Sequence, residues 1–195
     1  MDHIVGVVLA AGGGSRFAGP GHKLLADLDG VPDVVRSVAS ACAAGFELVV
    51  VVTGAVDVAP ALGAAGLLDQ VHLADNPDWA AGQAGSLRVG LAAATLADPE
   101  VRAAVVGLGD QPSVADEAWR RVALGGAGHP IVVATYAGRR RNPVRLDRSV
   151  WAELCADGDE GARELMRRRP ELVTEVPCPG EPADIDTVED LTRWS

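Results

Sequence analysis

A glycine-rich stretch near the amino terminus has the residue types that bind phosphate. Three consecutive glycines at positions 12–14 follow an apolar run that ends at Leu9, and the cations Arg16 and Lys23 come after them. Glycines let backbone N–H groups converge on an oxyanion without a Cβ in the way, and the cations add full positive charges. The alternative is a tight turn whose basic side chains only meet solvent. The combination of features favours a phosphate-binding loop.

Two familiar phosphate-binding motifs do not fit this loop. The dinucleotide fingerprint G-x-G-x-x-G would need a third glycine where Phe17 stands. The P-loop pattern G-x-x-x-x-G-K-[ST] needs a glycine before its lysine and a hydroxyl after it, whereas Lys23 stands between His22 and Leu24. What remains is the pattern L-A-A-G-x-x-S-R, followed at a distance by a lysine.

Carboxylates at two further places could bind a metal ion. Asp110 comes directly after the apolar run 103–108, within G-D-Q-P, and Mg²⁺ prefers such hard oxygen ligands. Asp184 and Asp186 are separated by one apolar residue, so they would point to the same side of an extended segment. Either could be a second ligand. The alternative for all three is capping of a following helix.

A long loop at residues 76–85 leads into a helix that could meet an anion. Ser86 lies where the helix amino terminus offers free N–H groups. Arg88 lies in the first turn, which is unfavourable for a cation unless an anion faces it. Trp79, within the loop, could either fill the core beneath it or stack on a base.

The formal net charge of −10 argues against a nucleic-acid partner, which would demand clustered excess of Lys and Arg. Two arginine triplets nevertheless stand out, at residues 139–141 and 167–169. In an acidic protein such basic islands can dock an anionic small molecule. For residues 167–169, just before Pro170, a solvated helix end is the better interpretation.

Length and composition predict one domain. A chain of 195 residues that is 48% hydrophobic can bury one sizeable core. Its apolar runs fall short of the about 18 residues that a membrane span needs, and the amino terminus lacks a basic leader, so we expect a cytoplasmic protein without a membrane partner. Three scattered cysteines support neither a disulfide framework nor a metal site, and we expect buried or inert thiols.

Apolar runs alternate with helical patterns along most of the chain, which predicts an α/β fold with a single doubly wound, mainly parallel sheet. We expect a hairpin or chain reversal across residues 137–142. Ligands bind beyond the carboxyl ends of such strands, so the glycine loop and Asp110 should meet there. The expected strands lie at residues 4–9, 47–53, 71–73, 103–108, 131–136, 143–146 and 172–176. The expected helices lie at residues 31–44, 57–65, 85–96, 115–124, 149–156, 160–168 and 187–194.

The motifs resemble, in chain order, those of MobA-like NTP transferases, and most closely the molybdenum cofactor cytidylyltransferases. The resemblance covers nearly the whole chain and rests on L-A-A-G-x-x-S-R, N-P-x-W-x-x-G-x-x-x-S-L-R-x-G-L, G-D-Q-P and D-I-D-T-x-E-D-L. There are two departures. The segment between Arg16 and Lys23 is longer than in the family, and residues 141–144 read R-N-P-V where the family has G-H-P-V.

The resemblance implies a Rossmann-like nucleotidyltransferase fold of the nucleotide-diphospho-sugar transferase type. It also implies Mg²⁺-dependent transfer of CMP from CTP to the phosphate of molybdopterin, with release of pyrophosphate. CTP is expected over GTP because L-A-A-G goes with cytidylyl transfer, and a molybdoenzyme or its chaperone could receive the product. The alternatives are guanylyl or other transfer to a sugar phosphate or a phospholactate-like acceptor, a non-catalytic nucleotide-binding regulator, and a nicotinamide dehydrogenase.

In the expected reaction an acceptor phosphate oxygen attacks the α-phosphorus in line, so positioning and charge neutralisation do the catalysis. By resemblance and position, the expected catalytic residues are Arg16, Lys23 and Asp110. The expected metal ligands are Asp110, Asp184 and Asp186. The expected nucleotide-binding residues are Leu9, Ala10, Ala11, Gly12, Gly13, Gly14, Ser15, Arg16, Lys23 and Ser86. The expected acceptor-binding residues are Arg88, Gln111, Arg140, Arg141 and Asn142.

Overall fold

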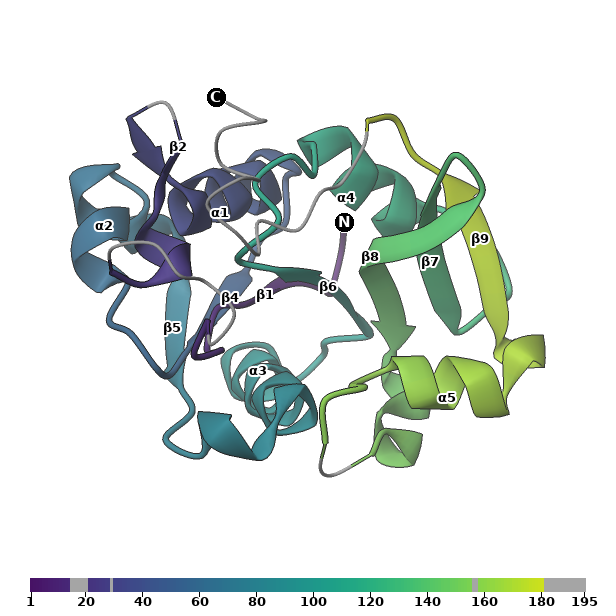
Figure 1. Ribbon diagram of the computed structural model, residues 1–195. Helices are drawn as coiled ribbons and strands as arrows, with labels where there is room; N and C mark the ends of the chain where they lie inside the picture. Colours follow the sequence, from purple (N-terminus) through teal and green to yellow (C-terminus); the bar gives the residue numbers. More distant parts are fainter. Residues whose placement is uncertain (15–20, 29, 156–157, 181–195) are drawn as a thin grey trace.

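A seven-stranded sheet forms the centre of the protein, in the order β5-β4-β1-β6-β8-β7-β9 (Figure 1). The computed structural model describes residues 1–14, 21–28, 30–155 and 158–180. Strands β5, β4, β1 and β6 are parallel, β8 is antiparallel to β6 and β7, and β9 is parallel to β7. The mainly parallel α/β sheet is confirmed. The strands are β1 (Ile4–Leu9), β4 (Val49–Thr53), β5 (His72–Asp75), β6 (Ala103–Leu108), β7 (Ile131–Tyr136), β8 (Arg139–Asp147) and β9 (Val173–Pro177).

Helices cover both faces of the sheet (Figure 1). Helices α1 (Asp33–Ala43) and α4 (Asp116–Leu124) pack on one face, where Val38 and Trp119 share a core with α2 (Ala59–Ala64). Helices α3 (Gln83–Ala97) and α5 (Arg163–Arg168) pack on the other face.

Side-chain alternation along β1 explains the two cores. Val5, Val7 and Leu9 belong to the core on the α3 side, while Val8 belongs to the core on the α1 side. Successive side chains of a strand point to opposite faces, so a continuous apolar run suits a strand that is covered on both.

The predicted hairpin forms, but its second strand is longer than expected. Ala137 and Gly138 make a two-residue turn with φ of 49° and 76°, and β8 begins directly after it at Arg139. Two-residue turns with positive φ at both positions match the right-handed twist of the flanking strands. The arginine triplet 139–141 therefore lies on a strand and not in the turn.

Several element boundaries differ from the sequence expectation. Residues 31–32 form β3 (Val31–Pro32), paired with β2 (Asp27–Leu28), before α1 begins. Residues 149–156 were expected as an α-helix, but the chain forms a 3-10 helix, η4 (Arg148–Glu153). Helix α5 starts at Arg163, three residues later than expected, and Gly161 just before it takes a positive φ. The expected helix 187–194 lies outside the described residues. The other 3-10 helices are η1 (Lys23–Leu25), η2 (Leu68–Gln70), η3 (Trp79–Ala81) and η5 (Pro170–Leu172).

The three cysteines, Cys42, Cys155 and Cys178, are half-buried free thiols. Burial raises the pKa of Cys42 and Cys178, and the hydrogen bond to Glu164 raises the pKa of Cys155. Thiols with raised pKa values stay protonated and react slowly. Over the described residues, every helix is too short or too polar to cross a membrane.

Candidate active site

The glycine loop is tied to the sheet where it leaves β1. The Ala10 N–H donates to the Val52 carbonyl at 2.8 Å, and the Ala11 carbonyl accepts from the Ala55 N–H at 3.0 Å. Both alanines are buried, with 1% and 2% of their surface exposed. These contacts fix the start of the loop, so Gly12 begins from a rigid base.

Two of the three loop glycines are required by close packing. A β-carbon built at Gly13 would lie 2.7 Å from Cζ3 of Trp79, so that ring packs directly against the loop. Gly14 has φ of +62°, and a β-carbon there would lie 3.0 Å from Cγ of Lys23. Around Gly12 a β-carbon would meet nothing within 4 Å. Trp79 therefore supports the loop from below.

Lys23 and Asp110 form an ion pair where β1 and β6 end, although they are 87 residues apart in the chain. The Lys23 ammonium donates to Oδ2 of Asp110, and the two side chains are 11% and 18% exposed. Gly109 lets the ends of β1 and β6 come close together. Its N–H donates to the Leu9 carbonyl at 2.9 Å, and a β-carbon at Gly109 would lie only 3.0 Å from the β-carbon of Ala10. Helix α4 begins only at Asp116 with Ala115 as its N-cap, so Asp110 does not cap it.

Asp33 is a third charged residue of this cluster that the sequence analysis missed. It is the first residue of α1 and is fully buried, and neither carboxylate oxygen has a hydrogen-bond partner within the described parts of the chain. Burial raises the pKa of Asp33 to about 7, with the Asp110 charge acting in the same direction and Arg36 and Lys23 opposing. An acidic residue at the start of a helix is usually explained by its favourable interaction with the helix dipole. Nothing in the sequence therefore indicated that Asp33 lies near Asp110.

His22 is a second residue that sequence reasoning did not find. Its Nδ1 accepts the Leu24 N–H at 3.3 Å, and its ring packs near Gly14. Burial lowers the pKa of His22, the backbone of Gly12 opposes this, and the Lys23 charge lowers it further. A neutral imidazole beside the glycine loop could donate or accept a hydrogen bond without adding charge.

Carboxylate oxygens are suitable ligands for a hard divalent cation, but the described part of the site contains few carboxylates. Asp110 and Asp33 offer carboxylate oxygens of the kind that Mg²⁺ and Mn²⁺ take, usually with phosphate oxygens and water. Among the residues that the structure describes, no group of three or more His, Cys, Asp or Glu side chains could hold a metal ion alone. Ser15, Arg16, Asp184 and Asp186 lie outside those residues.

Ser86 and Arg88 lie on the first turns of α3. Ser86 is 5% exposed, and its hydroxyl accepts a hydrogen bond of 2.9 Å from the Asn76 side chain. The α3 amino terminus also meets another chain segment, because the Ala84 N–H donates to the Gly158 carbonyl at 2.9 Å. Arg88 is exposed on α3. Roles for both in ligand binding stay predictions.

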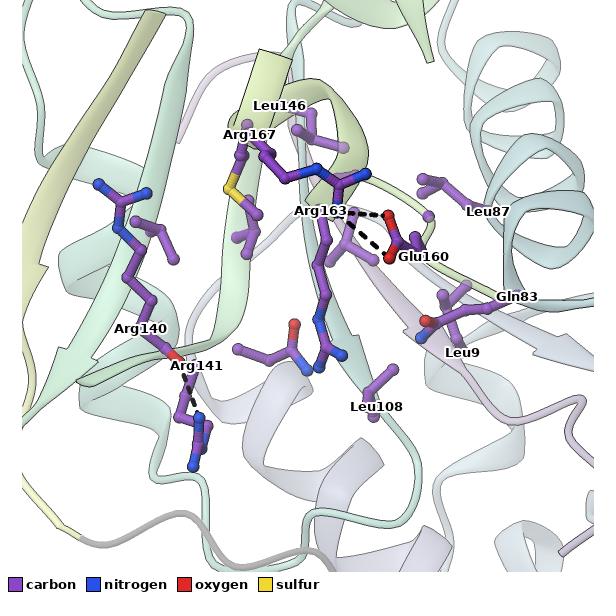
Figure 2. Close-up of a pocket in the computed structure, with 17 residues that line it drawn as sticks. Leu9, Gln83, Leu87, Leu108, Arg140, Arg141, Leu146, Glu160, Arg163 and Arg167 are labelled. Atoms are coloured by element: carbon purple, nitrogen blue, oxygen red, sulfur yellow. Dashed lines mark hydrogen bonds and ion pairs between the residues drawn. The ribbon is translucent and has the colours of Figure 1, made fainter. Parts of the chain in front are cut away.

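Three of the expected acceptor-binding residues, Arg140, Arg141 and Asn142, line a pocket on the α3 side of the sheet (Figure 2). Asn142 also donates to the Gln111 side chain at 3.2 Å. Gln111 is 2% exposed and directly follows Asp110. This hydrogen bond joins one wall of the pocket to the loop that holds the ion pair.

The family assignment follows from the sequence of the whole domain. Residues 6–173 match the model of the MobA-like NTP transferase domain. This chain belongs to the MobA-like NTP transferase domain family. Members of that family use nucleoside triphosphates, which supports a nucleotidyltransferase activity of this chain.

Solved structures of similar proteins share this fold over nearly the whole chain. The Rv0371c protein of Mycobacterium tuberculosis H37Rv is 33% identical with a TM-score of 0.79, and the match covers 97% of this chain and 96% of that chain. That protein has also been solved as a complex with manganese, with 32% identity and a TM-score of 0.79 over 98% of this chain and 97% of that one.

A further relative of this MobA-like protein has a different named activity. Nicotine blue oxidoreductase of Paenarthrobacter nicotinovorans is 31% identical over 201 residues, which cover 97% of this chain and 95% of the relative. The family therefore includes a protein named for oxidation–reduction at a similarity that spans the full domain.

Proposed function

We propose that this protein transfers a nucleoside monophosphate, CMP from CTP, to the phosphate of a molybdopterin-type acceptor and releases pyrophosphate. The observation that carries the proposal is the Lys23–Asp110 pair at the joined ends of β1 and β6, beside a glycine loop held by Trp79. A cation can bind the triphosphate, and a neighbouring carboxylate can bind the divalent ion that accompanies it.

The transfer needs orientation and charge neutralisation more than a proton acceptor. An acceptor phosphate oxygen forms a bond to the α-phosphorus, the bond from that phosphorus to the bridging oxygen breaks, and pyrophosphate leaves with the electron pair. We assign the β- and γ-phosphates to the backbone N–H groups of residues 12–14 with Arg16, and the α-phosphate to Lys23. The nucleophile is already an anion, so no side-chain base is required.

A divalent ion would be held by Asp110 together with Asp184 or Asp186, and it would neutralise charge on the phosphates when bound. Two facts support this part of the proposal. Asp110 lies at a strand end with 18% of its side chain exposed, and a protein of the same fold at 32% identity has been solved with manganese. We propose Mg²⁺ as the ion in this protein and expect Mn²⁺ to replace it.

The preference for CTP rests on the L-A-A-G motif. The Ala11 side chain is 2% exposed and faces Gly54, where a built β-carbon would lie 3.0 Å from that of Ala11. We expect the Ala11 methyl group to narrow the space beside the base and so to favour a pyrimidine. A guanylyl or other transferase acting on a sugar phosphate or phospholactate-like acceptor would share the same phosphate machinery.

Pyrophosphate release tests the proposal directly. The purified protein is incubated with molybdopterin, Mg²⁺ and each of the four ribonucleoside triphosphates in turn. CTP should give the highest kcat/KM, and omission of either Mg²⁺ or the acceptor should abolish release. Equal or faster turnover with GTP would contradict the CTP assignment, and no release with any triphosphate would contradict the transfer itself.

A second candidate function is reduction of a small molecule by a nicotinamide nucleotide, which the similarity to nicotine blue oxidoreductase favours. The loop lacks the dinucleotide fingerprint because Phe17 stands at the third glycine position. Isothermal titration with NADH, NADPH, CTP and GTP separates the two functions. Binding of a reduced nicotinamide nucleotide without binding of either triphosphate would favour the oxidoreductase.

A further inference from the structure

The pocket on the α3 side of the sheet combines apolar walls with an unusual number of arginines (Figure 2). Its volume is about 450 Å³, within the range of sites for small organic ligands. Leu9 and Leu108, the last residues of β1 and β6, line it, so it lies at the carboxyl ends of these strands, where the glycine loop starts. The walls are the apolar side chains Leu87, Val106, Val133, Val144, Leu146 and Met166.

Four arginines line the same cavity, and two of them are already neutralised. Arg167 pairs with Glu160 at 2.9 Å, and Arg140 pairs with Glu175 at 2.7 Å. Arg141 donates only to the Arg140 carbonyl, at 3.1 Å, and Arg163 has no carboxylate partner within the described ranges of the chain. Figure 2 shows the Arg163 side chain extending from the 160–167 segment into the cavity.

Two guanidinium groups without carboxylate partners in the described part of the chain lie beside an apolar wall. This combination can bind a ligand that has both an anionic group and an apolar part. Low-dielectric walls strengthen an ion pair formed next to them, and guanidinium groups bind phosphate or carboxylate in a bidentate manner.

We propose that this pocket binds a ring-bearing acid, with its ring against the apolar walls and an anionic group on Arg141 and Arg163. Resting on the proposed function, this ligand is the acceptor, which enters on the α3 side of the sheet. The link to the reaction is the hydrogen bond from Asn142 to Gln111, which connects the pocket wall to the residue after Asp110. Arg163 is the residue that the family motifs did not single out.

Binding of 1-naphthyl phosphate, measured by isothermal titration without any nucleotide, tests the pocket. This probe has both required parts, whereas 1-naphthol and inorganic phosphate each have one. The naphthyl phosphate should bind about tenfold or more tightly than either single-part probe, because the two contacts act together. Equal binding of inorganic phosphate, or no binding of naphthyl phosphate at millimolar concentration, would overturn the proposal.

Charge reversals on one helix give a matched comparison. Arg163→Glu should weaken naphthyl phosphate binding by about tenfold or more, because one guanidinium is lost and a repelling carboxylate is gained. Arg168→Glu changes the net charge equally on the same helix but lies outside the pocket lining, so it should have little effect. Equal losses in the two variants would mean general charge attraction and would overturn the site.

A variant that fills the cavity tests the location without changing charge. Ala162→Trp places a large ring at the pocket lining and should abolish naphthyl phosphate binding, while an unchanged melting temperature shows that the protein stays folded. Normal binding by a folded Ala162→Trp protein would overturn the proposal. If Arg163-dependent binding is found but no triphosphate supports pyrophosphate release, the pocket stands and the proposed transfer fails.

Discussion

At the residue scale, Asp33 adds a buried carboxylate to the site that holds Lys23 and Asp110. Its buried carboxylate shares a small space with Asp110 and Lys23, and the raised pKa near 7 reflects the cost of keeping that charge there. A bound cation or phosphate-bearing ligand would change this balance. Asp33 therefore links the protonation of the site to the stability of the folded protein.

Asp33→Asn should flatten the dependence of stability on pH. The pKa of Asp33 is raised in the folded state, so the folded protein binds the extra proton between about pH 4 and 7, and wild-type stability falls as the pH rises through that window. The asparagine variant lacks this loss, which amounts to about 2 kcal/mol or more. Urea unfolding at pH 4.5, 6 and 7.5 in metal-free buffer gives the comparison.

Asp69 provides the control for this measurement because it is exposed on η2. Asp69→Asn should leave the wild-type pH profile in place. An Asp33→Asn profile that runs parallel to the wild type across pH 4.5–7.5 would contradict a raised pKa for Asp33.

Gly13 and Gly12 differ in a way that only the structure reveals. Gly13→Ala should lower stability by about 1–3 kcal/mol and weaken triphosphate binding, because its β-carbon would overlap the Trp79 ring and displace the loop. Gly12→Ala meets open space, so its effect on stability should be small. Thermal unfolding and CTP titration on both variants check this. Equal stability of the two would show that Trp79 does not support the loop.

At the scale of elements, the β7–β8 hairpin decides where the arginine triplet lies. The sequence suggested a reversal over residues 137–142, and the actual turn is only Ala137-Gly138. The short turn brings Arg139, Arg140 and Arg141 onto β8, and the last two onto the pocket wall. Turn length is hard to predict here because Ala137 is not a residue that normally signals positive φ.

Ala137→Asn should stabilise the protein by about 0.5–1 kcal/mol, because asparagine tolerates the positive φ of 49° better than alanine and Asn-Gly favours this turn. Urea unfolding at constant pH measures the change. A stability equal to or below that of the wild type would argue against the two-residue turn.

At the scale of the whole molecule, the main architecture was predictable because it follows from buried runs. The runs at residues 4–9 and 103–108 became neighbouring parallel strands, β1 and β6, so the ends that lead into the glycine loop and Asp110 lie side by side. Asp33 and Arg163 were not predictable, because their importance comes from neighbours that are distant in the sequence. His22 was missed although its neighbours Gly14 and Leu24 are close in the chain. The roles of Arg16, Asp184 and Asp186 stay predictions.

Replacement of Asp110 is the most direct test of the proposed nucleotidyl transfer. Asp110→Ala should lower kcat for pyrophosphate release from CTP by about 10²-fold or more, because it removes the proposed metal ligand, whose effect would grow as pyrophosphate departs. The melting temperature should change little, since the relief of repulsion on the buried Asp33 offsets the loss of the ion pair with Lys23. Turnover and thermal unfolding are measured on the same sample. Near-wild-type kcat in a destabilised Asp110→Ala protein would contradict the catalytic site described here.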